Sequence, residues 1–409
     1  MNSPYSVLQI RDFRFFILAR LFVTLGIQVQ AVAVGLQVYE ITKDPLSLGL
    51  IGLAEAIPAI TVSLYAGHLA DIVQRKNIIV ACVITLSLCA LALFSFTTDV
   101  GSSLLFYGAI PIYTVIFVTG IARGFLSPAN FSFMPQLIER HLYQNAITWN
   151  STTWETASVG GPMIGGLIYG FWGITATYNA AAVLIVGGLI CYLLIPNRAL
   201  PPVSEELGIY EKIKAGISFV FKNQIVLAAI SLDLFAVLFG GAIALLPIFA
   251  NEILKVGAIG FGFLRSAPAI GAVLMAVFIT HYPIKKNIGR ILLWCVAGFG
   301  VCMIGFALSD LFWLSMLFLI LSGVFDCVSV IIRGTLIHTL TPENMKGRVS
   351  AVNSIFIGSS NELGAFESGL AAKLMGVVPS VIFGGCMTIA VVSTTAWKAV
   401  KLRTLEKLY

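Results

Sequence analysis

The sequence has little charge for its length. Asp, Glu, Lys and Arg make up only 11% of its 409 residues, whereas a soluble domain carries about 25%. Hydrophobic residues make up 58%. So few charged groups cannot cover the water-facing surface of a chain this long. A soluble protein is therefore excluded, and the lipid bilayer becomes the solvent for most of the chain.

Motifs for nucleotide and metal chemistry are also absent. The chain contains neither G-x-x-x-x-G-K-[ST], which would hold a nucleotide phosphate, nor the H-E-x-x-H of zinc hydrolases. The four histidines lie far apart in sequence: His68, His141, His281 and His338. The seven cysteines have neither CxxC nor zinc-ligand spacing, which favours simple burial. We therefore expect no enzyme activity, no cofactor and no metal site, and energy supplied by an ion or substrate gradient.

What the chain does contain is a series of long apolar runs. They are about 20 residues long or longer and do not alternate with a period of two, which favours helices over a closed barrel. Hydropathy and turn residues predict about twelve spans. The first is a retained helix rather than a signal peptide. The predicted spans are 13–39, 46–70, 77–97, 104–126, 147–170, 174–195, 224–250, 256–280, 289–308, 311–333, 347–374 and 377–399.

Basic residues fall almost entirely on one side of these spans. The opposite loops carry only Lys43, Lys255 and Lys373. This asymmetry predicts a multi-pass protein of the inner or plasma membrane with both termini in the cytoplasm. It also explains the net charge of +6 by topology, so no nucleic-acid partner is expected.

The two halves of the chain repeat one another. An offset of 203 residues relates Gly120, Asn150, Gly161 and Gly166 to Gly323, Asn353, Gly364 and Gly369, and an offset of 210 relates Gly52 and Pro58 to Gly262 and Pro268. Six spans per half keep the repeats in the same orientation. We therefore predict an N-terminal six-helix bundle over 1–197, a cytoplasmic amphipathic linker over 198–223 and a C-terminal six-helix bundle over 224–409.

Two motifs indicate a family. Residues 67–76 resemble the loop signature between the second and third helices of the major facilitator superfamily, with Gln74 in place of the usual glycine. The matching gate positions are Gly67, Asp71, Arg75 and Lys76. Residues 161–166 resemble the fifth-helix antiporter motif of exporters in that family through Gly161, Pro162, Gly165 and Gly166, although Ala157 replaces an upstream glycine.

Further stretches are similar to the enterobactin-exporter-like branch of that superfamily, which covers drug and siderophore efflux. They include 120–130, 262–269 and 341–343. The resemblance implies an all-α membrane protein with the major facilitator fold and about twelve transmembrane helices. It also implies that Asp71 caps the cytoplasmic end of span eleven, and that the fifth helix seals the outer half of the protein.

Ionisable residues lie inside the predicted spans. Each costs about 2.5–3.5 kcal/mol when it faces lipid at the helix centre, so a cavity or a partner is expected. Candidates for proton coupling are Asp233, Glu362, Glu55 and Glu155, and candidates for the cavity or substrate site are Arg20, Arg123, Arg265 and Asp326. Static ion pairing, for example of Arg123 with Glu155, is the alternative for each.

These features predict a secondary active transporter. We expect a monomer that exports a small siderophore- or drug-like molecule in exchange for protons, by rocker-switch alternating access in the lipid bilayer. An importer or a lysolipid flippase on the same fold is the first alternative. A non-transporting membrane scaffold or sensor is the second.

Overall fold

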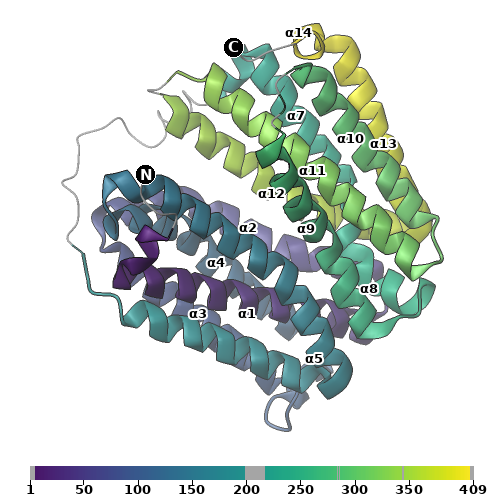
Figure 1. The fold of residues 1–409 in the computed structure, drawn as a ribbon. Helices are drawn as coiled ribbons and strands as arrows, with labels where there is room; N and C mark the ends of the chain where they lie inside the picture. Colours follow the sequence, from purple (N-terminus) through teal and green to yellow (C-terminus); the bar gives the residue numbers. More distant parts are fainter. Residues whose placement is uncertain (1–4, 199–216, 283, 285, 343–344, 406–409) are drawn as a thin grey trace. The chain divides into compact units, whose positions relative to one another are not determined.

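A computed structural model describes residues 5–198, 217–282, 284, 286–342 and 345–405. All regular elements in these ranges are helices (Figure 1), which confirms the predicted all-α class. The long helices are α1 (Arg11–Thr42), α2 (Pro45–Ile72), α3 (Arg75–Ser95), α4 (Ile110–Phe133), α5 (Tyr143–Leu193), α7 (Gln224–Phe239), α9 (Gly257–His281), α10 (Ile288–Ala307), α11 (Phe312–Leu340), α12 (Lys346–Met375) and α13 (Val377–Lys398). Shorter helical turns are η1 (Ser6–Gln9), η2 (Ser102–Tyr107), η3 (Met134–Gln136), η4 (Arg140–Leu142), η5 (Ala242–Leu245), α8 (Leu246–Ile248), η6 (Phe249–Ile253) and α14 (Val400–Arg403).

The described residues contain 10 helices that are long and apolar enough to cross a membrane. α5 holds two predicted spans, because its two arms meet at Gly173, where φ is 79°. α12, which covers the predicted span 347–374, is not among the ten. The predicted start of the fourth span at 104 is wrong: η2 and Gly108, with φ 67°, come first, and α4 begins at Ile110.

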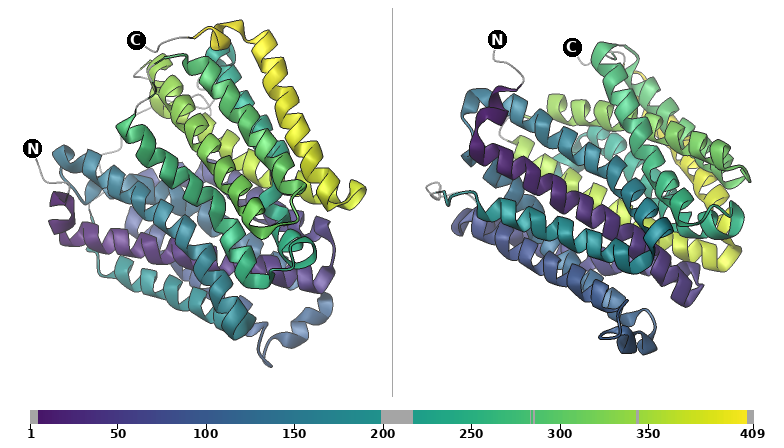
Figure 2. Two further views of the ribbon diagram at one scale, coloured as in Figure 1. Left: turned by 45° about the vertical axis from the view of Figure 1, so that its right-hand side comes forward. Right: turned by 60° about the horizontal axis from the view of Figure 1, so that its bottom comes forward.

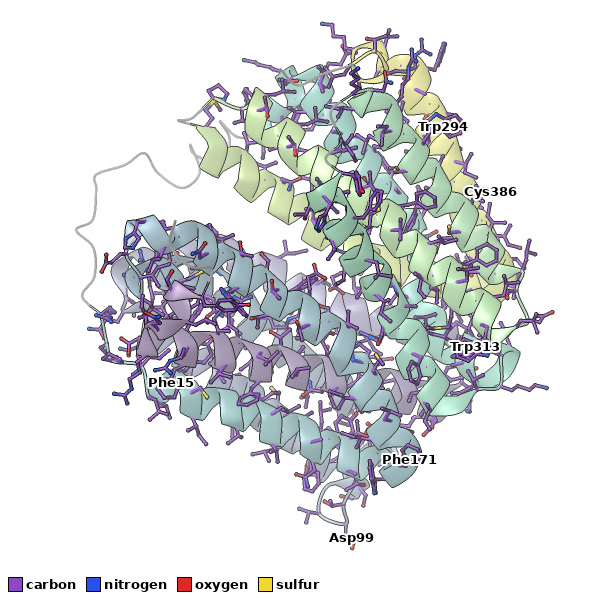
Figure 3. All side chains as sticks on the ribbon, in the orientation of Figure 1. Phe15, Asp99, Phe171, Trp294, Trp313 and Cys386 are labelled. Atoms are coloured by element: carbon purple, nitrogen blue, oxygen red, sulfur yellow. The ribbon has the colours of Figure 1, made fainter. Side chains whose placement is uncertain are left out.

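Large apolar side chains cover the outer faces of these helices. Trp294 of α10 and Trp313 of α11 point outward and are 76% and 79% exposed (Figure 3). Phe171 of α5 is also exposed and points outward. Isolated exposed apolar residues are normal, but a dense covering of them marks a surface that meets lipid. The observed surface therefore agrees with the bilayer as solvent.

The chain forms two compact units. The first comprises Met1–Lys43, Ala54–Ser204 and Gly257–Ser266, and the second comprises Asp44–Leu53, Glu205–Val256 and Ala267–Tyr409. Two helices are thus shared: α2 begins in the second unit and continues in the first, and α9 begins in the first and continues in the second. Most of the predicted linker 198–223 lies outside the described residues, and 217–222 is helical.

Each unit has its own apolar core. In the first unit, α1 runs alongside α5 in both views of Figure 2, and Phe16, Phe133 and Tyr192 are fully buried there with side chains of α3. In the second unit, α10 lies between α11 and α13 (Figure 1), and Leu292 and Leu336 are buried in its core. Because lipid is as apolar as these side chains, close van der Waals packing rather than the hydrophobic effect stabilises each core.

The internal repeat has a geometric counterpart. In the first unit α4 crosses α2 so closely that a Cβ on Gly120 would collide with the carbonyl group of Glu55. In the second unit α11 crosses α9, and a Cβ on Gly323 would collide with the carbonyl group of Pro268. Gly120 and Gly323 are the residues related by the offset of 203. Small residues at a crossing let two backbones approach, so the two units use the same packing device at equivalent places.

Candidate functional site

The loop motif holds helix ends together in the first unit. Arg75 Nη1 donates to the carbonyl oxygen of Ser132 over 2.9 Å, and Lys76 Nζ donates to that of Leu193 over 3.2 Å. Both carbonyls lie in the last turn of a helix, α4 and α5, where carbonyl groups lack helical partners and attract cations. The side chain of Asp71 lies outside the described residues, as does its predicted contact near Gly347, and at Gly67 only the backbone is described.

The antiporter motif of α5 packs against two helices. On one side Gly161 faces Gln28 of α1, and a Cβ on Gly165 would lie 3.2 Å from the Cα of Val29. On the other side a Cβ on Gly166 would lie 2.7 Å from the Cα of Gly262 in α9. The motif therefore allows close backbone packing on both faces of α5.

A second crossing of the same kind lies in the second unit. A Cβ on Gly369 of α12 would lie 2.9 Å from the Cα of Gly49 in α2. Gly166 and Gly369 are related by the offset of 203. The carbonyl oxygens of Pro162 and Pro45 also border these two crossings. Each crossing joins a helix from one half of the sequence to a helix from the other half.

Two candidate residues form an ion pair inside the first unit. Arg123 Nη1 of α4 contacts Glu55 Oε1 of α2. The interpretation that Arg123 pairs with Glu155 is therefore wrong: Glu155 lies on α5, half-buried, with no ion-pair partner in the described part of the chain. The close crossing at Gly120 brings the α2 turn that carries Glu55 within reach of Arg123. This pairing compensates the cost of placing both charges in an apolar environment.

A buried ion pair lies in the second unit. Asp233 Oδ1 of α7 contacts Arg333 Nη1 of α11, and the two residues are only 7% and 4% exposed. Asp233 was predicted as a site residue, whereas Arg333 was missed because the predicted span ended at 333. α11 continues to Leu340, so Arg333 lies two turns inside the helix. The offset of 203 relates Arg333 to Asn130, which is buried and accepts a hydrogen bond from Tyr192 Oη. This equivalence between the two halves was the one sequence feature that placed Arg333 inside a helix rather than at its end.

The remaining candidates are spread over several helices. Asp326 of α11 lines a small cavity together with Asp233. Glu362 of α12 lies against Gly52 of α2, whose Cβ would be 3.1 Å from Glu362 Oε2. Arg20 of α1 and Arg265 of α9 are half-buried. Within the first unit the structure pairs Glu55 with Arg123, and within the second unit it brings Asp233 and Asp326 to one cavity.

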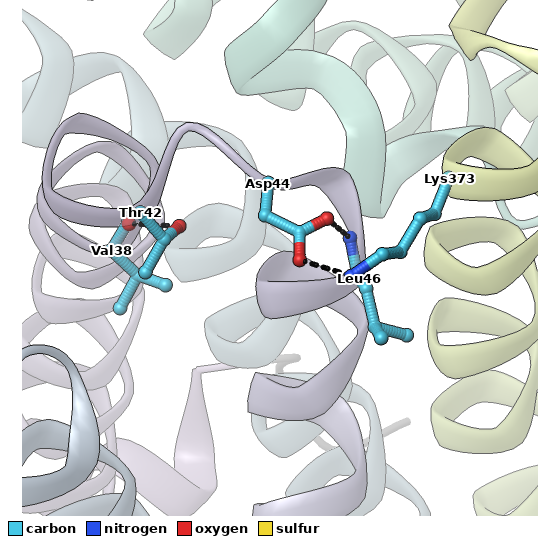
Figure 4. Close-up of polar contacts among 5 residues, drawn as sticks. All are labelled: Val38, Thr42, Asp44, Leu46 and Lys373. Carbon is cyan, nitrogen blue, oxygen red and sulfur yellow. Dashed lines mark hydrogen bonds and ion pairs between the residues drawn. The ribbon is translucent and has the colours of Figure 1, made fainter.

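Sequence reasoning also missed a contact at the start of α2. Lys373 Nζ donates to Asp44 Oδ2 over 2.8 Å, and Asp44 Oδ1 accepts from the N–H of Leu46 over 3.1 Å (Figure 4). Asp44 therefore caps the helix that begins at Pro45 and fastens it to the last turn of α12. The hydrogen bond from Lys373 holds the pKa of Asp44 below its ordinary value, with help from Leu46 N–H and against the effect of partial burial.

This contact gives a pH-dependent prediction. Because the pKa of Asp44 is lower in the folded than in the unfolded protein, its contribution is complete above about pH 4 and is lost as the pH falls through the folded value. Lys373→Gln should lower the free energy of unfolding by less than about 1 kcal/mol at pH 7, since the pair is partly exposed. Thermal unfolding in detergent between pH 7 and pH 3 should show the difference from wild type closing below pH 4. Lys398→Gln, in the last turn of α13, is the control, and a difference that does not shrink as the pH falls below 4 would contradict the assignment.

The chain is similar in sequence to known membrane proteins. Residues 2–408 match the family profile described as transmembrane secretion effector. The enterobactin exporter EntS of Shigella dysenteriae serotype 1 is 25% identical over 380 residues, covering 91% of this chain and 88% of that protein. The enterobactin exporter EntS of Escherichia coli O1:K1 / APEC matches to the same extent.

Solved structures share the fold. The POT family transporter PepTSo aligns with a TM-score of 0.74 at 13% identity, covering 96% of this chain and 98% of its own. A bacterial homologue of the human lysosomal transporter Spinster aligns with a TM-score of 0.69 at 14% identity, covering 96% of both chains. These likenesses confirm the predicted major facilitator fold. The relatives and the structural neighbours are transporters.

Proposed function

We propose, because this chain belongs to the transmembrane secretion effector family, that it exports a small siderophore- or drug-like molecule across the cell membrane in exchange for protons. Export proceeds by alternating access, in which the halves 1–197 and 224–409 tilt as two six-helix bundles and the termini stay in the cytoplasm. A catecholate is the first substrate to test, because the curated relatives are named enterobactin exporters.

The observation that carries this proposal is the pair of equivalent glycine crossings. Gly166 on Gly262 and Gly369 on Gly49 each join helices from different halves of the sequence. Contacts between small apolar residues leave no buried polar group unpaired when they separate. Two such contacts at equivalent positions are suited to repeated opening and closing, as alternating access requires.

Charge placement supports coupling to an ion. Glu55 and Asp233 are paired with Arg123 and Arg333 inside their own units, which keeps these charges compensated whichever way the halves tilt. Asp326 and Glu155 have no ion-pair partner in the described ranges. An unpaired carboxyl group in an apolar surrounding is the kind of group that can exchange a proton during a transport cycle.

The proposal is tested in proteoliposomes with an imposed pH gradient. Vesicles with an acidic lumen should accumulate radiolabelled enterobactin, because protons leave as the catecholate enters, and a protonophore should abolish the accumulation. Ethidium and a fluorescent lysolipid serve as parallel probes for drug efflux and lipid flipping. Transport that ignores the gradient and the protonophore would refute proton coupling. Absence of transport for all three probes would refute the exporter assignment for these substrate classes.

A further inference from the structure

A small cavity lies inside the second unit between α7, α10 and α11. Its volume is about 10 Å³, roughly the space that one water molecule needs. Polar groups from all three helices line it, among them Asp233, Cys295, Asp326 and Ser329, next to the rings of Phe299 and Phe325. The cavity therefore offers a water-sized polar site within an apolar bundle.

The charges around the cavity do not balance when both acids are ionised. Asp233 is paired with Arg333. Asp326 has neither an ion pair nor a hydrogen bond among the residues that the structure describes. The titratable groups that line the cavity with Asp326 are Asp233 and Cys295, and the guanidinium of Arg333 pairs with the first of them. Two carboxylates against one guanidinium leave a net charge of −1, which a single bound cation would neutralise.

Ser329 contributes a buried hydroxyl group to the cavity. It is 4% exposed and lines the cavity. Two hydroxyl side chains of α11 bond to their own helix, Ser322 Oγ to Leu319 O and Thr335 Oγ1 to Ile331 O, whereas the buried Ser315 Oγ has no partner among the described residues. Ser329 Oγ makes no such bond within the described part of the chain. A buried hydroxyl that forgoes this local bond is available to a guest in the cavity.

Three of these polar residues lie on the same face of α11. Asp326, Ser329 and Arg333 are three and four residues apart, so they form one stripe on the face of the helix. A water held by Ser329 would lie between the free carboxyl group and the fixed ion pair. Three side-chain groups in a space this small are too few for a sodium ion, which needs more oxygen ligands than a proton does.

We infer that this cavity is the proton-binding site of the transporter, an inference that rests on the proposed function. Asp326 takes up the proton, a water held by Ser329 delivers it, and the Asp233–Arg333 pair stays ionised and neutral overall. In the uptake step a hydronium ion transfers its proton to an Asp326 carboxylate oxygen and remains as water. Release reverses the step when the cavity connects to the other compartment.

Infrared difference spectroscopy on the purified protein tests the site without any substrate. Stepping the pH should reveal a protonated-carboxyl C=O band that is absent from Asp326→Asn and present in Asp326→Glu. Glu367→Gln, at a half-buried position of α12, is the matched control and should keep the band. An unchanged band in Asp326→Asn would overturn the inference. Loss of the band in NaCl but not in choline chloride would overturn it in favour of a sodium site.

Transport assays separate this inference from the proposed function. Asp326→Asn should lower the ratio of gradient-driven enterobactin accumulation to exchange at equal pH by at least tenfold relative to wild type. Ser329→Ala should slow accumulation about two- to tenfold and serves as the second variant if Asp326→Asn does not fold. Full gradient-driven accumulation in both variants would overturn the site. Failure of the wild-type protein to respond to pH, with the infrared band intact, would refute the proposed function and leave the proton site standing.

Discussion

Replacing Asp233 by alanine is expected to lower the free energy of unfolding by about 3–5 kcal/mol, because it leaves the guanidinium of Arg333 buried without its partner. Both side chains are more than nine-tenths buried, so water cannot take over the role of the lost carboxylate. Thermal unfolding of the purified protein in detergent, followed by intrinsic fluorescence, should show the loss as a lower midpoint. It should also show a smaller yield of folded protein.

The double replacement Asp233→Leu with Arg333→Met is the control for this effect. Removing both charges leaves no unpaired ion, and such replacements are often neutral or stabilising by about 1–4 kcal/mol. The double variant should therefore unfold well above the single variant. If both unfold at the same temperature, the cost lies in lost packing rather than in the unpaired charge, and the pair has a different role from the one assigned here.

Adding one methyl group at Gly166 is expected to abolish transport. A Cβ there would lie 2.7 Å from the Cα of Gly262 and 2.8 Å from the carbonyl oxygen of Ala258. Backbone atoms cannot move aside as a flexible side chain can, so α5 and α9 must separate in Gly166→Ala. The conformation in which this crossing is closed can then no longer form, so the transport cycle stops. Uptake into proteoliposomes should fall at least tenfold while the protein still inserts in the membrane.

Gly160→Ala provides a matched control on the same helix. The nearest atom to a Cβ at Gly160 is Leu25 Cδ2 at 3.8 Å, an ordinary contact. This variant should transport normally and gain about 0.8–1 kcal/mol, because alanine favours a helix over glycine by that amount. Equal transport by Gly160→Ala and Gly166→Ala would show that the crossing does not need to close.

Sequence reasoning located the helices and the α5 motif because both depend on local patterns. Apolar runs and turn residues set the helix limits. Glycines at fixed spacing indicate that another helix packs closely there, without identifying that helix. The Gly166–Gly262 contact was not predicted, because the repeat relates each residue to its counterpart in the other half and not to a contact partner.

The sequence did not predict which charged residues form ion pairs with one another. Which face of a helix a charged residue occupies depends on how far the helix extends and where it crosses its neighbours. Arg333 was assigned to a helix end because α11 is seven residues longer than its predicted limit at 333. Arg123 reaches Glu55 because α4 and α2 touch at Gly120, and no local pattern separates Glu55 from Glu155 as its partner.

The sharing of α2 between the two units has a consequence for biogenesis. Asp44, at the start of this helix, contacts Lys373, which follows 329 residues later in the chain. At about 5–20 residues per second, a ribosome needs roughly 16–66 s to bridge that interval. During this time the first turns of α2 have emerged and must wait beside lipid or the insertion machinery for their partner. A nascent chain halted before α12 would leave Asp44 without its lysine.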